Sequence, residues 1–340
     1  MRVDASAASV SWIPSEAVSG LMKAGFSTGL SHYDSPPPDS LGGPEAMQST
    51  LESLRDQDAF RFSNRMHCWA WFDGDTATEF GQDGGIVMGA TTVRVGRLGA
   101  TFQAVQMPDL QAEPEVGPGY VKFTQISGGR TALPLPRAIS RPPFFRLQAP
   151  LVWTTLSLTL RSDGTSEVGM EGASPFPRHW VYGPDGSLTL KAGLADWSGW
   201  TGQASWRRTP WGDEDSPVLV TAAETALERE LSVRLMHGDA KPTIRTFGEG
   251  RTLATEGEPG TSLMLILDGV VSVAVGGETL GELGPGAVLG ERAVLEGGLR
   301  TATVTAVTPV RVAEAAAEQI DVDALTRLAE GHRREEQTLS

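Results

Sequence analysis

The middle of the chain, from Phe60 to about Gly202, consists of short alternating or β-branched runs separated by glycine, proline and Asp-Gly pairs. Such runs are typical of β-strands, and an Asp-Gly pair between two of them indicates a hairpin turn. Because no helical pattern interrupts the runs, the sequence favours a sandwich or barrel over an alternating α/β fold. The predicted strands are residues 60–72, 86–95, 101–106, 120–126, 151–161, 166–171 and 187–191.

Helical spacing of apolar residues flanks this region. Two helices are predicted before it, at residues 12–26 and 44–54, separated by SHYDSPPPDS, whose successive prolines exclude a helix. A third is predicted after it, at residues 217–236, with Pro217 and three acidic residues at its start. The sequence therefore predicts a β-rich domain over residues 1–208, a linker and connecting helix over 209–240, and a second domain over 241–338.

The second domain is also rich in strands and glycine. The fold class predicted for the whole chain is mainly β with flanking helices (α+β). The strands expected here are residues 262–267, 270–275, 302–306 and 310–313, and a last helix is expected over 322–337, with Leu325 and Leu328 on one face.

Charge and composition limit the classes of partner. The 340 residues carry a formal net charge of −14, whereas binding to a phosphate backbone requires clustered Lys and Arg, so nucleic acid is not an expected partner. A single cysteine, Cys68, excludes a disulfide framework within one chain and fits a reducing compartment. Since no run of ~18 apolar residues occurs, we expect no membrane span and a cytoplasmic protein.

The amino-terminal part contains no recognisable catalytic motif. It has no G-x-S-x-G, H-E-x-x-H, P-loop or dinucleotide-binding fingerprint. His32, His67 and His179 lack the spacing of metal ligands, so we interpret them as structural residues and expect no metal. PFPRHWVYGPDG, residues 175–186, is interpreted as a rigid loop closing a hydrophobic core, the alternative being a pocket rim. No enzyme is indicated.

The segment LGERAVLEGGLRTATVTA, residues 289–306, offers the groups that an anionic cyclic phosphodiester needs: backbone amides, a fixed positive charge and an acceptor for the ribose hydroxyl. Gly290 permits close backbone approach, and residues 291–295 can form one short helical turn. Glu291 would accept a hydrogen bond from the ribose 2′-hydroxyl. Arg300, nine positions later (300 − 291), can fold back so that its guanidinium binds the phosphate oxygens.

This segment resembles the phosphate-binding cassette of cyclic nucleotide-binding domains, in which Phe-Gly-Glu-hydrophobic-Ala-hydrophobic precedes Arg-Ser/Thr/Ala-Ala-Thr-Val. The resemblance extends over residues 241–319, because FGEGRTLATEGEPGTSLMLILDGVVSV is similar to the family's opening strands and residues 303–313 to its closing strands. It implies a jelly-roll β-barrel and a bound cAMP or cGMP. The residues implied as ligand contacts are Gly290, Glu291, Ala293, Arg300 and Thr301, with Leu289 and Val304 supporting the sugar and base.

Three positions depart from the family pattern. Leu289 replaces the common Phe, Leu299 stands where Pro is frequent, and Arg292 occupies a position that is usually apolar. The charge of Arg292 either faces solvent or joins the phosphate site. Thr301 could bond the guanine amino group of cGMP, but the same residue occurs in domains that prefer cAMP. We favour cAMP because it is the more frequent ligand in the family.

Three functions remain open from the sequence. The first is a sensor in which the connecting helix transmits cyclic nucleotide occupancy to the amino-terminal domain, with Leu325, Leu328 or that domain covering the base. The second is an enzyme or small-molecule-binding domain regulated by the nucleotide domain, and the third is an interaction or scaffold module that binds no nucleotide. A DNA-binding helix-turn-helix is not expected, since only some 20 residues follow the barrel. A protein partner or a homodimer stays open.

Overall fold

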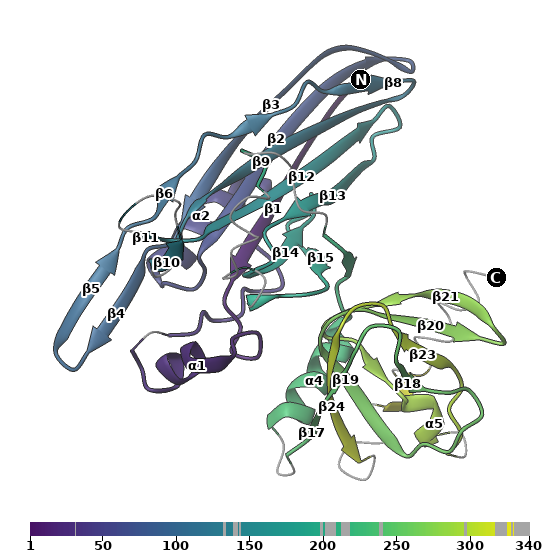
Figure 1. Cartoon of the computed structure of the whole chain (residues 1–340). Helices are drawn as coiled ribbons and strands as arrows, with labels where there is room; N and C mark the ends of the chain where they lie inside the picture. Colours follow the sequence, from purple (N-terminus) through teal and green to yellow (C-terminus); the bar gives the residue numbers. More distant parts are fainter. Residues whose placement is uncertain are drawn as a thin grey trace. The chain divides into compact units, whose positions relative to one another are not determined.

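The structure, a computed structural model, divides the chain into two compact units. The amino-terminal unit comprises Met1–Leu190 and Ala195–Val218, and the carboxy-terminal unit comprises Lys191–Leu194 and Leu219–Ser340. Figure 1 traces the elements of both along the chain. The residues that the structure describes are 1–30, 32–131, 134–138, 142, 144–197, 200, 209–211, 218–237, 241–295, 298–316, 325–327 and 329.

Two β-sheets form a sandwich in the amino-terminal unit, with strands β12 and β9 packed on β1 and β2 (Figure 1). From the chain of this unit, the first sheet takes strands in the order β15 (Leu188–Ala192), β14 (Arg178–Tyr182), β1 (Arg2–Trp12), β2 (Phe62–Asp73) and β3 (Thr76–Met88). The second has the order β13 (Ser166–Ala173), β12 (Leu151–Arg161), β9 (Tyr120–Arg130) and β6 (Val105–Gln106), and β7 (Leu110–Gln111) and β8 (Glu115–Gly117) also pair with β9. Two separate hairpins pair β4 (Thr91–Val95) with β5 (Leu98–Phe102) and β10 (Leu135–Ala138) with β11 (Phe145–Gln148).

Strand β1 is buried on both faces, because a helix packs against one face and the second sheet against the other. Val10 and Trp12 pack with Met47 of helix α2 (Pro44–Asp56), which covers the outer face. On the inner face the Ser9 hydroxyl lies 2.8 Å from Thr154 Oγ1 of β12, so the two sheets are joined by a hydrogen bond as well as by apolar packing. Helix α1 (Gly20–Ser27) contributes to a third cluster around Phe176.

Most strands predicted for this unit are confirmed. Strands β2, β9, β12, β13 and β15 lie where the alternating runs placed them, and the turn between β12 and β13 holds the predicted Asp-Gly pair. The predicted range 86–95 is divided between β3 and β4, and the range 101–106 between β5 and β6. Helix α2 begins at the predicted Pro44.

Two predictions for this unit are wrong. A helix over 12–26 was expected, but the residues up to Trp12 form β1 and the helix begins only at Gly20. The sequence of β1, RVDASAASVSW, has few β-branched residues, and it is pairing with β2 and β14 on both sides that makes it a strand. Residues 175–186 were expected to form a loop, yet Arg178–Tyr182 is a fully buried strand. Their expected place in the core is confirmed, since Phe176 and Tyr182 are 0% exposed.

The carboxy-terminal unit is a barrel of two four-stranded antiparallel sheets (Figure 1). One has the order β17 (Thr243–Phe247), β24 (Val310–Ala316), β19 (Ser262–Asp268) and β22 (Val288–Leu289). The other has the order β18 (Thr252–Ala254), β23 (Thr303–Ala306), β20 (Val271–Val275) and β21 (Glu278–Leu283). The four strands predicted here are confirmed, and the predicted jelly-roll fold with them.

Alternation along β19 explains how the barrel is filled and covered. Met264 and Ile266 point inward to the core between the two sheets. Leu263 and Leu265 point outward, where they pack against Leu231 of helix α4 (Ala226–His237) and other residues of the same cluster. The barrel therefore has one apolar outer face, and α4 covers it.

The predicted connecting helix over 217–236 is only partly correct. Residues 220–222 form a short strand, β16 (Val220–Ala222), and α4 begins at Ala226. Thr225 is the reason for this start: its backbone N–H and hydroxyl bind Glu228 Oε2 at 2.8 and 3.0 Å, while Glu228 N–H donates to the Thr225 hydroxyl at 3.2 Å. This reciprocal pair is a capping box, which begins a helix. Pro217 and the acidic residues before it lie outside the described residues.

The last predicted helix lies largely outside the described residues. Leu325 is helical and fully buried in the cluster formed with α4, and Leu328 is not among the residues described. Within the part of the chain that the structure describes, no helix is both long and apolar enough to cross a bilayer.

Candidate functional site

A pocket of about 440 Å³ opens in the carboxy-terminal unit beside the short helix α5 (Glu291–Leu295). Its walls come from residues 222–228, which lead into α4, from strand β21 with the turn that follows it, and from residues 289–293 and 300–304. Ala254, Met264 and Val273 of the barrel complete the lining. All eight residues predicted from the sequence line this pocket, namely Leu289, Gly290, Glu291, Arg292, Ala293, Arg300, Thr301 and Val304. The volume is within the range of pockets that hold small organic ligands.

Gly290 fixes the geometry at the entrance to α5. Its φ of +93° lies in the region that favours glycine. A Cβ at this position would lie 2.3 Å from Arg300 Nη1 and 2.8 Å from the Ser262 carbonyl oxygen. The backbone can therefore approach the guanidinium only because no side chain is present. The helical turn predicted for residues 291–295 is observed at those residues.

Arg300 is held by its backbone and by its side chain. Its N–H donates to Glu258 O at 2.8 Å and its carbonyl accepts from Gly257 N at 2.8 Å, which ties it to the turn between β18 and β19. In the side chain, Nη1 donates to Ser262 O at 2.8 Å and Nη2 to Ser262 Oγ at 3.0 Å. The guanidinium also lies over Gly260, whose Cβ would be 2.1 Å from Arg300 Nε.

A chain of polar contacts orients Ser262 toward Arg300. The Ser262 hydroxyl donates to Glu314 Oε1 at 2.6 Å, which leaves its lone pairs to accept from Arg300. Glu314 Oε2 accepts in turn from Arg245 Nη1 at 3.0 Å. The hydrogen bond from Ser262 and the charges of Arg245 and Arg300 lower the pKa of the Glu314 carboxyl. Burial lowers the pKa of the Arg300 guanidinium, opposed by the charges of Glu314 and Glu291, and it stays cationic at neutral pH.

The remaining predicted residues differ in burial. Glu291 is 5% exposed and its charge acts on Arg300. Leu289 and Val304 belong to the barrel core and present apolar surface to the pocket, whereas Arg292 and Thr301 are half-buried at its edge. The carboxylate, the guanidinium and an apolar wall therefore meet in one pocket.

Sequence reasoning missed the wall formed by residues 222–228. Glu224, Thr225 and Glu228 line the pocket, and the capping-box sequence T-A-L-E was the available signal. The sequence placed Leu325, Leu328 or the amino-terminal domain over the base. Leu325 instead lies in the core under α4 and does not line the pocket.

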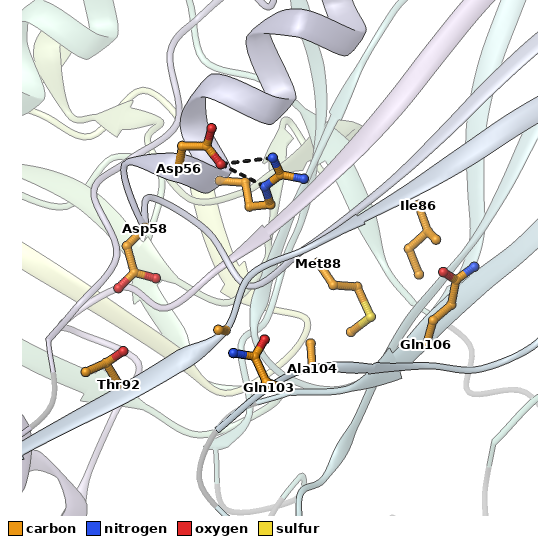
Figure 2. A pocket seen from close by; sticks show the side chains of 10 residues that line it. Asp56, Asp58, Ile86, Met88, Thr92, Gln103, Ala104 and Gln106 are labelled. Atoms are coloured by element: carbon orange, nitrogen blue, oxygen red, sulfur yellow. Dashed lines mark hydrogen bonds and ion pairs between the residues drawn. The ribbon is translucent and has the colours of Figure 1, made fainter. Parts of the chain in front are cut away.

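A second pocket, of about 450 Å³, lies in the amino-terminal unit (Figure 2). In Figure 2, Asp56 and Asp58 lie on one side of it and Ile86 and Gln106 on the other. The charges at its rim are paired within the protein: Asp56 with Arg55 at 2.9 Å, and Asp58 with the buried Arg61 at 2.6 Å. No residue predicted to bind a ligand lies here.

Two titratable side chains of the amino-terminal unit, His179 and Cys68, are buried and have shifted pKa values. His179 is 1% exposed, and it lies between Ser11 Oγ at 2.7 Å and the Ser174 carbonyl oxygen at 2.7 Å. Burial lowers the pKa of His179 to about 4, and burial raises the pKa of Cys68 to about 12. Neither residue lines a pocket described above. Among the described residues, no three His, Cys, Asp or Glu side chains gather in a way that could hold a metal ion.

Comparison with known proteins assigns the class of the carboxy-terminal unit. Residues 244–322 match the family model described as cyclic nucleotide-binding domain. The predicted resemblance over residues 241–319 is thereby confirmed, and this part of the chain is a cyclic nucleotide-binding domain within a mainly β protein.

The relatives match short stretches of the chain. A stretch of 66 residues is 44% identical to a cyclic nucleotide-gated potassium channel of Mesorhizobium japonicum and covers 19% of this chain and 18% of that one. Another of 63 residues is 41% identical to a cGMP-dependent protein kinase of Caenorhabditis briggsae, over 18% of this chain and 8% of that one. The match thus spans less than a fifth of either relative. A solved cyclic nucleotide-binding domain from Methylobacillus flagellatus is 30% identical, over 28% of this chain and 53% of that chain, with a TM-score of 0.21.

Proposed function

We propose that the carboxy-terminal unit binds one cyclic nucleotide in the pocket beside α5 and thereby regulates the amino-terminal sandwich. The observation that carries the proposal is that Arg300 and Glu291 line the same pocket with opposite charges, next to a glycine that only a close backbone approach explains. Arg300 offers a planar fork for two phosphate oxygens, and Glu291 offers an acceptor for the ribose 2′-hydroxyl. Ala254, Met264 and Val304 supply apolar surface for the sugar and base.

We expect cAMP to bind more tightly than cGMP, because cAMP is the more frequent ligand in the family that this unit resembles. Thr301 lines the pocket and is the residue whose hydroxyl would favour guanine. Replacing Thr301 with alanine therefore weakens cGMP and leaves cAMP unchanged if that hydroxyl binds the guanine amino group.

Binding is tested by isothermal titration calorimetry with cAMP, with cGMP, and with 5′-AMP, which has the same base but no cyclic phosphodiester. We expect one site for a cyclic nucleotide and much weaker binding of 5′-AMP. At about 100 times the dissociation constant, the ligand should stabilise the unit by roughly 2.7 kcal/mol in differential scanning calorimetry. Absence of heat and of stabilisation with both cyclic nucleotides would leave the unit as an interaction module.

Regulation is tested by tryptophan fluorescence, because the position of the tryptophans makes this signal specific to one of the two units. All nine tryptophans, from Trp12 to Trp211, belong to the amino-terminal unit, and the carboxy-terminal unit has none. A change in tryptophan emission on saturation with nucleotide therefore reports on the amino-terminal unit alone. We expect such a change, and an unaltered spectrum at full occupancy would contradict regulation.

The role of Glu291 is tested with Glu291→Gln and with 2′-deoxy-cAMP. A hydrogen bond to a buried carboxylate contributes about 1.5 to 3 kcal/mol, so the wild type should bind 2′-deoxy-cAMP roughly 10- to 150-fold more weakly than cAMP. In Glu291→Gln the two ligands should differ by much less. Glu249→Gln, the same change at an exposed position, is the control. An undiminished preference for cAMP in Glu291→Gln would remove Glu291 from the site.

A further inference from the structure

A short segment from far upstream is built into the nucleotide-binding unit. Lys191–Leu194 belongs to that unit, although the residues before and after it belong to the amino-terminal unit. Gly193 N–H donates to Leu219 O at 2.8 Å, and the Gly193 carbonyl accepts from Gly269 N at 2.7 Å. A Cβ at Gly193 would lie 2.2 Å from Val270 Cγ2, so the segment is packed closely on the barrel. The chain therefore enters this unit at Lys191, leaves it after Leu194, and enters it again at Leu219.

The side chain of Lys191 ends in a buried ion pair with the wall of the pocket. Lys191 Nζ binds Glu224 Oε2, and the two side chains are 4% and 6% exposed. The other carboxylate oxygen of Glu224 accepts from Arg229 Nε of α4 at 3.1 Å. An ion pair that is shielded from water is weakly screened, so movement of one partner acts strongly on the other.

Glu224 also contacts the turn that leads into the ligand-binding segment. A Cβ on Gly286 would lie 2.5 Å from Glu224 Oε2, so the turn backbone lies against the carboxylate. Two residues later, Val288 N–H donates to Glu228 Oε1 at 3.4 Å, just before Leu289 and Gly290. Glu224 and Glu228 therefore join the start of α4 to the backbone that precedes α5, and both line the pocket.

We propose that the Lys191–Glu224 ion pair is the link by which occupancy of the pocket reaches the amino-terminal unit. The proposal rests on the proposed function. Strand β15 (Leu188–Ala192) is the physical route, because its last two residues belong to the nucleotide-binding unit and its first three to the sheet of the sandwich. A ligand shifts a conformation only where its contacts differ between states, and Glu224 lines the wall that the ligand touches. A shift of that wall displaces Lys191 and, through the continuous strand, the first three residues of β15 in that sheet.

The test separates binding from transmission in one set of variants. In Lys191→Met, calorimetry should give a cyclic nucleotide affinity within about threefold of wild type, since Lys191 does not line the pocket. The change in tryptophan emission on saturation should fall by at least half. Lys191→Arg, which keeps the charge, should preserve the emission change, and Lys241→Met, the same substitution at an exposed lysine of the same unit, should resemble wild type.

Hydrogen exchange on the wild-type chain gives a second measurement that needs no variant. Saturating nucleotide should slow amide exchange in peptides that cover residues 188–194. If wild type binds no nucleotide in calorimetry, the proposed function itself fails. If it binds, and either Lys191→Met keeps the full emission change or exchange at residues 188–194 does not respond, the Lys191–Glu224 link is overturned while the proposed function of the pocket stands.

Discussion

Replacing Arg300 with alanine should weaken cyclic nucleotide binding by about a hundredfold, which corresponds to about 3 kcal/mol. The expected loss is large because the guanidinium is half-buried, so its charge acts on the phosphate with little screening by water. Arg300→Lys should lose about tenfold, since an ammonium keeps the charge but lacks the planar fork for two oxygens. Titration calorimetry of both variants measures the two values.

The control for Arg300 must remove the same charge elsewhere in the same unit. Arg251 is exposed and does not line the pocket, so Arg251→Ala should bind nucleotide like wild type. Removing Arg300 also takes away the donor that Ser262 O accepts from, so unfolding should be followed by calorimetry to show that the unit stays folded. Binding of cAMP by a folded Arg300→Ala protein within about threefold of wild type would show that the phosphate is held elsewhere.

Salt dependence gives an independent reading of the same site. If Arg300 binds the phosphate, raising the ionic strength weakens nucleotide binding in wild type, and less so in Arg300→Ala, which has lost one charge. Arg292 also lines the pocket. If the dependence of nucleotide affinity on ionic strength is the same in Arg300→Ala as in wild type, the electrostatic attraction comes from the remaining charges, Arg292 among them.

The segment that carries Gly290, Glu291 and Arg300 could be predicted from the sequence because its geometry is local. Residues 291–295 form the expected turn, and Gly290, which was expected to permit close backbone approach, adopts a positive φ beside Arg300. Arg300 follows Glu291 by only nine positions, so few alternative arrangements of the two side chains are available. The strands of the barrel were likewise predictable, because each alternates between a core face and an outer face.

The parts that could not be predicted depend on contacts between distant segments. β1 is rich in Ala and Ser and becomes a strand only because β2 and β14 pair with it. β14 follows two prolines in a stretch rich in turn residues, which hides a buried strand. Lys191 pairs with Glu224, 33 positions later, and no local pattern indicates that pair. The same holds for the pocket wall at residues 222–228, where Glu224 packs against the backbone of the distant Gly286.

Acidification should destabilise the amino-terminal unit between about pH 6.5 and about pH 4 through His179. Its pKa falls from 6.5 to about 4 because burial disfavours the charged imidazolium. The native state therefore binds fewer protons than the unfolded state in this window, so stability rises with pH across it and is lost as the pH falls. A difference of about 2.5 pH units corresponds to about 3 kcal/mol at most.

The hydrogen bonds of His179 determine which substitution can test its effect on acid stability. The Ser174 carbonyl can only accept, so His179 Nε2 carries the proton and Nδ1 accepts from the Ser11 hydroxyl. His179→Gln keeps an amide donor and acceptor without a titrating group, and should be less stable at pH 7 yet lose less stability on acidification. Denaturant unfolding at a series of pH values, followed by tryptophan fluorescence, reads out this unit alone because all nine tryptophans lie in it.

The matched control for the pH experiment is His67→Gln in the same sheet. His67 is partly open to solvent, with 29% of its side chain exposed, and it also bonds a serine, Ser6, at 3.1 Å. Its replacement should leave the acid sensitivity attributed to His179 in place, because His179 and its two hydrogen bonds are unchanged. Carboxylates such as Asp163 and Asp185 titrate below their ordinary range in both proteins, since hydrogen bonds from Thr165 and Ser187 lower their pKa values. A wild-type slope between pH 6.5 and 4 that survives in His179→Gln would assign the acid sensitivity to other groups and contradict the role given to His179.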